Sequence, residues 1–198
     1  MKMYKKYGKR IIDIILGLFT LPFIIIILII FGPIIYFTDK GSIFYNAERV
    51  GKKGQIFKMY KLRSMRVNAP DLRNSDGSTY NGDDDPRVTA IGKIMRKTSI
   101  DEVPQFLNVI KGDMSIIGPR PNLPTVPYNE LPELEKRRLD VKPGITGYNQ
   151  AYFRNSVSSV EKFKNDVYYV ENLTLGMDIK VFFHTIISVL KRENINIS

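Results

Sequence analysis

The sequence contains no cysteine, and it has a single histidine, His184. Without cysteine there is no disulfide framework, no thiolate metal site and no thiol nucleophile. A single histidine excludes His-rich metal sites and argues against a Ser/His mechanism. There is no internal repeat, no Gly-x-x-x-x-Gly-Lys-Ser/Thr loop and no Gly-x-Gly-x-x-Gly after a strand, so standard P-loop and dinucleotide folds are not indicated.

Negative charge is scarce relative to positive charge. The 198 residues include 30 Lys and Arg against 20 Asp and Glu, which gives a formal net charge of +10. Such a surplus suits nucleic acid, phospholipid headgroups or nucleotide phosphates, and charge alone does not separate the three. Because no nucleic-acid recognition motif is present and a membrane segment explains the charge more simply, we expect no nucleic-acid partner.

The range Ile11 to Phe37 is almost wholly apolar. It exceeds the roughly 20 residues that a spanning helix needs, and it is too long for a cleaved signal peptide. Pro22 lies near its middle, where proline bends a helix. Both flanks are basic, and the positive-inside rule places both in the cytoplasm. Two interpretations stay open from physics: a spanning helix, or a helix that enters, breaks at Leu21-Pro22 and returns.

The rest of the chain predicts an α/β domain that is mostly helical with a small sheet. Strands are predicted over 42–45 and 55–60, with Gly51-Lys-Lys-Gly54 as a turn between them. Residues 68–87 are polar and rich in Gly and Asp. Their triple Asp at 83–85 could hold a metal, but a solvated loop is the favoured interpretation.

Helical periodicity continues in the second half of the chain. Helices are predicted over 89–97, from Thr98 or Ser99 to Gly112, over 129–139, over 161–169 and from Met177 onward. The last is amphipathic and either packs on the core or lies on lipid. His184 is expected on its polar face. Asp178 at its start is interpreted as an N-cap or as an acid aimed at a site.

The adjacent acids Asp101 and Glu102 are the strongest candidate site. Neighbouring carboxylates repel each other and need a cation to balance them in an apolar setting. The structural alternative is a capped helix start, because acids in a first turn suit the helix dipole. Gly118-Pro-Arg120-Pro121 limits the backbone freedom of one arginine, as a preorganised phosphate contact requires. Pro143-Gly-Ile-Thr-Gly147 is predicted to be a turn.

These patterns together resemble the bacterial sugar transferases, the monotopic phosphoglycosyl transferases of minimal, catalytic-core size. The resemblance extends from Lys9 to Arg192 and rests on a set of motifs in a fixed order. These are Lys61-Leu-Arg-Ser-Met65, Ser99-Ile-Asp-Glu-Val-Pro-Gln105, Gly112-Asp-Met-Ser115, Gly118-Pro-Arg-Pro121, Pro143-Gly-Ile-Thr-Gly147 and Asp166-Val-Tyr-Tyr169.

The resemblance implies a re-entrant membrane-anchoring helix-break-helix over 1–38 and a catalytic domain with amphipathic surface helices over 39–198. It implies a location on the cytoplasmic face of the bacterial inner membrane, in contact with the phospholipid bilayer. Relatives often carry Ser before the membrane proline, where this chain has Leu21. The oligomeric state and the sugar are not indicated.

The implied reaction moves a phospho-sugar from a UDP-sugar to a polyprenyl (undecaprenyl) phosphate, releasing UMP in a two-step, ping-pong sequence that requires Mg²⁺. Alternatives are a glycosyltransferase that moves only the sugar, and a membrane-anchored scaffold or lipid-binding module without activity.

The resemblance assigns the family's roles to matching positions in this sequence. Asp101 is the candidate nucleophile, and Glu102 is a candidate metal ligand or proton-shuttling group. Asp178 matches a third acid of the metal site, and Asp166 matches an acid with a less defined role. A group of basic residues is assigned to the phosphates and the nucleotide: Lys61, Arg96, Arg120 and Arg154.

Overall fold

The computed structural model describes residues 3–73, 80, 82, 84–153 and 157–191. Contacts divide the chain into two compact units. The first unit comprises Met1–Phe19, Glu48–Met59 and Gln105–Ile197, and the second comprises Thr20–Ala47 and Tyr60–Pro104, with Ser198. This division follows the packing of the chain. The expected boundary between an anchor over 1–38 and a catalytic domain over 39–198 follows hydropathy, so the two divisions do not coincide.

The apolar segment forms one helix, α1, over Lys9–Asp39, after a π-helical turn over Tyr4–Gly8. Pro22 and Pro33 lie inside it, so the predicted interruption at Leu21-Pro22 is not a gap in the helix. Proline removes one N–H donor and bends a helix, but the hydrogen bonds on either side can persist. The most apolar window has a mean hydropathy of 3.2 and is 11% buried, so by length and composition this helix could cross or re-enter a membrane.

A parallel pair of strands lies at the centre of the first unit. Strand β3, Ser115–Ile117, pairs with β4, Gly144–Thr146, with Ser115 opposite Gly144 and Ile117 opposite Thr146. The predicted turn at 143–147 is therefore wrong over these three residues. A Cβ on Gly144 would stand 2.1 Å from the backbone nitrogen of Gly118. Glycine is therefore needed here because the two backbones approach each other closely, and not because the chain turns.

A second sheet consists of β1, Ala47–Val50, and β2, Ile56–Met59, joined by a 3₁₀ turn over Lys52–Gly54. The strand predicted at 55–60 and the turn before it are confirmed. The strand predicted at 42–45 is wrong, because this segment forms only an isolated bridge between Phe44 and Leu62.

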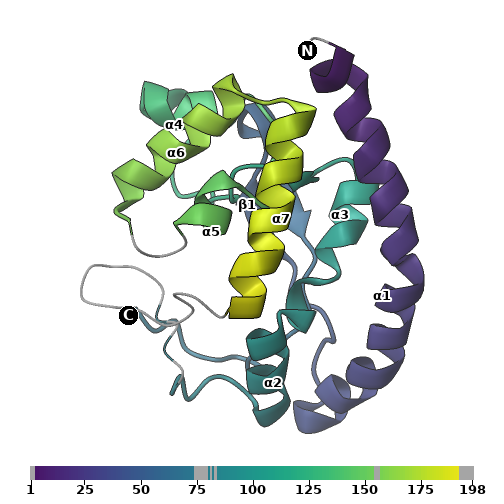
Figure 1. Cartoon of the computed structure of the whole chain (residues 1–198). Coiled ribbons are helices and arrows are strands. Elements are labelled where there is room, and N and C mark those ends of the chain that lie inside the picture. The colour runs from purple at the N-terminus through teal and green to yellow at the C-terminus, as the bar shows by residue number, and fades with distance from the viewer. Residues whose placement is uncertain (1–2, 74–79, 81, 83, 154–156, 192–198) are drawn as a thin grey trace. The chain divides into compact units, whose positions relative to one another are not determined.

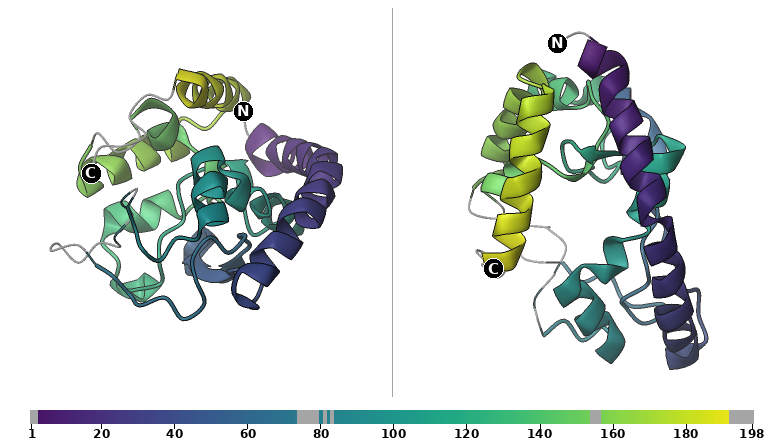
Figure 2. Two further views of the ribbon diagram at one scale, coloured as in Figure 1. Left: turned by 90° about the horizontal axis from the view of Figure 1, so that it is seen from below. Right: turned by 45° about the vertical axis from the view of Figure 1, so that its right-hand side comes forward.

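Five helices complete the described part of the first unit. They are α3 (Gln105–Lys111), α4 (Glu133–Arg138), α5 (Tyr148–Tyr152), α6 (Ser159–Glu171) and α7 (Leu175–Lys191), with a 3₁₀ turn at Tyr128–Glu130. Helix α5 packs against α6 and α7, and α4 packs against α6 (Figures 1 and 2). The predicted helices at 161–169 and from 177 are confirmed, and Gly112, with φ of +102°, ends α3 as expected.

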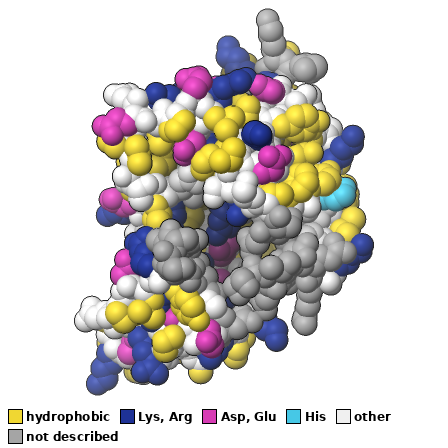
Figure 3. Space-filling model, turned by 90° about the vertical axis from the view of Figure 1, so that its left-hand side faces the viewer, with side chains coloured by type: hydrophobic (Ala, Val, Ile, Leu, Met, Phe, Trp, Pro, Cys, Tyr) yellow, Lys and Arg dark blue, Asp and Glu magenta, His cyan; other side chains and the backbone are white. Residues whose placement is uncertain are grey.

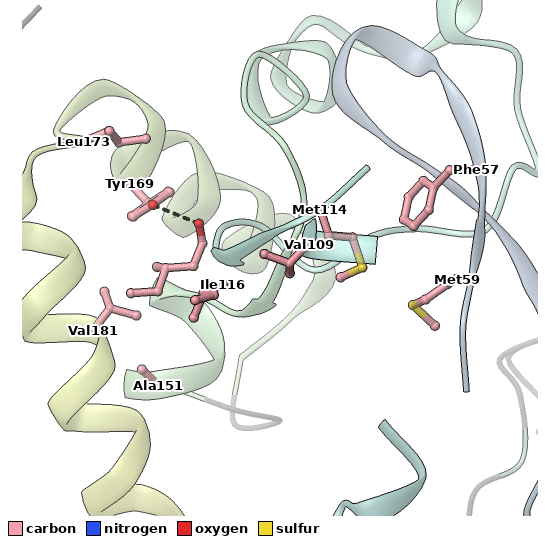
Figure 4. Close-up of a cluster of buried hydrophobic side chains, with 10 residues drawn as sticks. Phe57, Met59, Val109, Met114, Ile116, Ala151, Tyr169, Leu173 and Val181 are labelled. Carbon is pink, nitrogen blue, oxygen red and sulfur yellow. Dashed lines mark hydrogen bonds between the residues drawn. The ribbon is translucent and has the colours of Figure 1, made fainter. Parts of the chain in front are cut away.

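The core of the first unit draws on both sheets and on the helices. Its buried members are Phe57, Met59, Val109, Met114, Ile116, Ile117, Ala151, Tyr169, Leu173 and Val181 (Figure 4). The hydroxyl of Tyr169 shares its proton between the carbonyl of Ile117 at 3.1 Å and the nearer Asp178 Oδ1 at 2.6 Å, which satisfies the polar end of a fully buried ring. The core thereby fixes α6 against β3.

The second unit contains α2, Ala90–Thr98, which confirms the helix predicted over 89–97. Thr89 is its N-cap, and the Thr89 side chain accepts from the N–H of Gly92. Its core is built from Ile35, Leu62 and Met95. Asp85 of the triple-Asp segment is fully buried and pairs with Arg87 at 2.8 Å, so this acid has a structural partner. Asp83 lies outside the described residues.

Lys and Arg side chains are scattered among hydrophobic and acidic ones on the face shown in Figure 3. His184 is exposed on α7, as expected, and its ring stacks on Tyr152 with 4.0 Å between centroids. The outer face of α7 also exposes several large apolar side chains: Ile179, Phe182, Phe183, Ile186 and Ile187. Such a face suits contact with lipid.

Candidate active site

The adjacent acids lie in a short 3₁₀ turn of the second unit, Ile100–Glu102, directly after α2. The helix predicted to run from Ser99 through both acids is wrong. Ser99 takes a left-handed conformation with φ of 56°, which ends α2, and α3 begins only at Gln105. Asp101 and Glu102 therefore do not lie at the start of an α-helix. The alternative interpretation, in which the two acids serve only a capped helix start, is not supported.

Lys61 lies beside both carboxylates. The Nζ of Lys61 lies 2.9 Å from Oδ2 of Asp101 and 3.2 Å from Oε1 of Glu102. Asp101 is 1% exposed, whereas the Glu102 side chain is 26% exposed. One acid is therefore enclosed and held by a cation, while its neighbour faces the solvent from which a substrate would arrive.

Backbone hydrogen bonds fix the lysine beside the acids. The N–H of Leu62 donates to the carbonyl of Asp101 at 2.9 Å. The N–H of Tyr45 donates to the carbonyl of Lys61 at 2.8 Å, and that of Arg63 donates to Ile43 at 2.9 Å. The segment that carries Lys61 is thus tied on both sides, so the ammonium group is positioned before any ligand binds.

An additional pair, which the sequence analysis did not predict, ties this segment to the end of α1. Arg63 Nη2 donates to Asp39 Oδ1 at 2.6 Å and to the carbonyl of Ile35 at 3.1 Å. The other oxygen of Asp39 accepts from the N–H of Val67 at 2.8 Å. Within the second unit, the C-terminal end of α1 therefore supports the segment that carries Lys61.

One oxygen of the enclosed acid is incompletely satisfied. Oδ2 of Asp101 accepts no hydrogen bond from the residues that the structure describes, and its contact with Lys61 is an ion pair without hydrogen-bond geometry. A buried acceptor without a hydrogen bond is costly and is retained where it serves a ligand or a reaction. The Asp101 carboxylate therefore keeps an oxygen that could serve as a nucleophile or as a metal ligand.

The site fits a hard divalent cation in its chemistry. Mg²⁺ prefers oxygen ligands and is often held by one or two carboxylates together with substrate phosphates. The unsatisfied oxygen of Asp101 and the partly exposed Glu102 supply such a pair. Among residues 3–73, 80, 82, 84–153 and 157–191, no group of three or more acidic or histidine side chains is placed to hold a metal.

Asp178 occupies a separate network in the first unit. Its Oδ1 accepts from the hydroxyl of Tyr169 at 2.6 Å, and its Oδ2 pairs with Lys9 at 2.6 Å and with the hydroxyl of Tyr4. Thr174, not Asp178, caps α7 through the N–H of Met177, so the N-cap interpretation is wrong. The proposed metal role of Asp178 stays a prediction.

Asp166 pairs with Arg138, a buried arginine at the end of α4. Arg138 Nη2 and Nε lie 2.7 and 2.9 Å from Asp166 Oδ2, and both residues are 3% exposed. Burial raises the pKa of the Asp166 carboxyl, and the nearby guanidinium opposes that rise. The Phe163 ring covers the guanidinium at 4.8 Å, completing a closed structural ion pair.

The remaining basic candidates differ in their surroundings. Arg96 is half-buried in the second unit, and its Nε donates to Ser64 Oγ at 3.0 Å. Arg120 is exposed in the first unit, and its carbonyl accepts from Arg138 Nη2 at 2.7 Å, which fixes its backbone. Arg154 lies outside the described residues. Of the predicted site residues, the structure brings together Lys61, Asp101 and Glu102.

Comparison with known proteins assigns the family. The model of the family described as bacterial sugar transferase matches residues 4–192. The chain belongs to this family.

Individual relatives agree with that assignment. This bacterial sugar transferase is 42% identical over 205 residues to the galactosyl transferase CpsE of Streptococcus agalactiae, covering 96% of the chain and 44% of CpsE. It is 39% identical over 190 residues to the uncharacterized sugar transferase EpsL of Bacillus subtilis, covering 94% of the chain and 89% of EpsL.

A third relative is named for its substrates. The undecaprenyl-phosphate galactose phosphotransferase of Salmonella typhimurium is 37% identical over 215 residues, covering 97% of the chain and 42% of that protein. The bacterial sugar transferase described here therefore spans less than half the length of two of these relatives, and its sequence corresponds to one part of them.

Proposed function

We propose that this bacterial sugar transferase moves a phospho-sugar from a UDP-sugar to a polyprenyl phosphate such as undecaprenyl phosphate, releasing UMP. Such a reaction is the first membrane step in building a bacterial glycoconjugate or polysaccharide. The observation that carries the proposal is the enclosed carboxylate of Asp101, held by Lys61, with one oxygen that accepts no hydrogen bond from a described residue. Relatives named as undecaprenyl-phosphate sugar phosphotransferases support the substrate pair.

The first chemical step forms a bond from an Asp101 oxygen to the β-phosphorus of the donor. The bond from that phosphorus to the oxygen bridging the two phosphates breaks, and UMP leaves with the bridging oxygen. The enzyme then carries an acyl-phosphate that links Asp101 to the sugar phosphate. A carboxylate needs no deprotonation before attack, and covalent capture divides one difficult transfer into two easier ones.

In the second step, an oxygen of the polyprenyl phosphate attacks the same phosphorus. The bond to Asp101 breaks and the carboxylate is regenerated, so the product is a polyprenyl diphosphate sugar. The acceptor oxygen is already anionic, and no net proton transfer is needed. Lys61 holds the carboxylate in place in both steps, because its backbone is fixed on either side.

Bound Mg²⁺ would neutralise negative charge on the transferring phosphates. Asp101 and Glu102 are the residues that would hold it. Glu102 also lies where it could exchange a proton with solvent, because its side chain is partly exposed. Asp178 is retained as a third candidate ligand, and Asp166 as a structural support through Arg138.

Arg96, Arg120 and Arg154 are proposed to bind the phosphates and the nucleotide. Arg120→Lys is expected to lower kcat/KM about 100-fold, because lysine cannot reproduce the two parallel hydrogen bonds of a guanidinium on phosphate. Initial rates of UMP release measure the effect. Arg137→Lys, at an exposed residue paired with Glu171, is the matched control and should leave the rate unchanged. An Arg120→Lys variant as active as wild type would remove Arg120 from the donor site.

The by-product separates this proposal from transfer of the sugar alone, which the name of the relative CpsE leaves open as a second candidate. With a panel of UDP-sugars, undecaprenyl phosphate and Mg²⁺, we expect one UMP for each lipid product formed. The productive donor also identifies the sugar. Release of UDP in place of UMP would show that the phosphate is not transferred.

The membrane anchor is proposed to be re-entrant, with both ends of α1 on the cytoplasmic face. The basic residues on both flanks support this topology, and the second unit ties the distal end of α1 to the segment carrying Lys61 through Asp39 and Arg63. A lipid-linked acceptor phosphate requires a catalytic centre at the membrane surface, which a shallow anchor provides.

Single cysteines test the topology directly, because the chain has none of its own. In Lys6→Cys and Asn46→Cys, both cysteines should react with a membrane-impermeant maleimide only from the cytoplasmic side of oriented vesicles. Labelling from opposite sides would establish a spanning helix.

A further inference from the structure

A second group of basic residues surrounds a cavity in the first unit, formed by residues other than those of the candidate active site. The cavity has a volume of about 260 Å³. Its wall comprises Gly51, Lys52, Lys53, Gln55, Phe57, Gly112, Asp113 and Lys142. The 3₁₀ turn between β1 and β2 supplies one side, and the residues that follow α3 supply another.

The one acid on this wall is already engaged. Asp113 lies 3.1 Å from Lys111 and 3.3 Å from the side-chain amide of Asn108. Lys53 is likewise neutralised, because its Nζ lies 2.5 Å from Asp140. The charge that remains on the wall is that of Lys52 and Lys142.

Lys142 is half-buried, and no acid among the described residues pairs with it. Burial lowers the pKa of its ammonium group, and the nearby charges of Arg10 and Lys52 lower it further. The charges of Asp13 and Asp113 oppose this fall in the pKa. The pKa is lowered even with these two acids nearby, so a further anion beside Lys142 would stabilise the half-buried ammonium group.

Arg10 brings a third cation to the same place. Its guanidinium is oriented by the carbonyls at the end of α3, donating to Val109 at 2.5 Å and to Ile110 at 2.7 Å. A Cβ added to Gly112 would stand 3.2 Å from Arg10 Nη2 and 3.4 Å from Lys142 Nζ. The two nitrogens therefore converge on the space beside Gly112, which glycine leaves open.

We propose that Arg10, Lys52 and Lys142 form a binding site for the phosphate group of an anionic membrane lipid. Arg10 immediately precedes the apolar run that begins at Ile11, which places its guanidinium at the depth of lipid headgroups. A phosphate oxygen beside Gly112 would accept from both nitrogens in charge-assisted hydrogen bonds. A zwitterionic headgroup carries a cation that this site repels, so the site selects net negative charge.

Native mass spectrometry of the full chain in detergent, titrated with phosphatidylglycerol or phosphatidylcholine, tests the proposal. Wild type should retain phosphatidylglycerol in preference to phosphatidylcholine. Lys142→Gln should weaken phosphatidylglycerol binding about tenfold, the value of one charge-assisted hydrogen bond. Lys58→Gln, which removes one charge from an exposed position on β2, is the matched control and should bind as wild type does.

A second variant and a competition with inorganic phosphate complete the test. If Lys142→Gln does not fold, Lys52→Gln at an exposed position takes its place, with several-fold weaker binding expected. Equal binding by wild type and both variants would overturn the site. Inorganic phosphate that binds in a Lys142-dependent way, without competition from phosphatidylglycerol, would show that the ligand is a soluble anion and overturn the lipid assignment. None of these readouts depends on turnover.

Discussion

Asp101→Asn is expected to lower turnover by at least about 10³-fold, because an amide cannot form the acyl-phosphate on which the two-step reaction depends. The substitution keeps the shape of a side chain that is 1% exposed. The substitution breaks the buried Lys61–Asp101 ion pair but leaves Lys61 paired with Glu102, so the free energy of unfolding should fall by less than the roughly 3–5 kcal/mol of a fully broken buried pair. Lipid-product formation and a denaturation curve measure the two effects separately.

Asp140→Asn is the matched control for that experiment. Asp140 is an exposed acid that pairs with Lys53, and exposed pairs contribute little to stability. It should retain the wild-type rate. Wild-type turnover by Asp101→Asn would exclude Asp101 as a covalent nucleophile, and would return the scaffold and the sugar-only transferase to consideration.

Arg138→Met is expected to destabilise the protein by about 3–5 kcal/mol, because it leaves the buried carboxylate of Asp166 without its cation. The double variant Arg138→Met/Asp166→Leu removes both charges and should recover most of the loss. Arg137→Met, on the neighbouring exposed arginine, should change the free energy of unfolding by less than about 1 kcal/mol. Chemical denaturation in detergent measures all three.

The pH dependence of stability tests whether Asp166 causes the stability loss of the Arg138→Met variant. Burial already raises the pKa of this carboxyl, and loss of Arg138 removes the effect that opposes the rise. A raised carboxyl pKa favours the protonated form in the folded state, so its penalty grows as the pH rises above the unfolded value of about 4. The Arg138→Met variant should therefore regain stability on acidification from pH 7 toward pH 5. A deficit that does not change with pH would point to lost packing on Phe163.

Local signals in the sequence were sufficient for much of the secondary structure. The helix predicted over 89–97 forms as α2, and Gly112 ends α3 as predicted, because helical periodicity and left-handed glycine depend on neighbouring residues. The strand at 55–60 was likewise predicted from its composition and the turn before it. The pairing of β3 with β4 was missed, since it joins segments far apart in the chain.

The position of the candidate site was predicted from the sequence, but the conformation of the site was not. The motif around Asp101 and Glu102 was predicted, whereas the left-handed Ser99 that separates them from α2 has no signature in its residue type. Lys61 was assigned to phosphate binding, and its contact with both acids comes only from the fold. The Lys9–Asp178 and Arg138–Asp166 pairs were missed because nothing local links residues that fold together from distant segments.

Incubating the enzyme with the donor and Mg²⁺ in the absence of acceptor is the most direct test of the covalent mechanism. Intact mass and peptide mapping should show one phospho-sugar adduct on Asp101, formed with an equal amount of UMP and discharged when polyprenyl phosphate is added. Full turnover with acceptor but no adduct and no UMP with donor alone would contradict the mechanism proposed for Asp101.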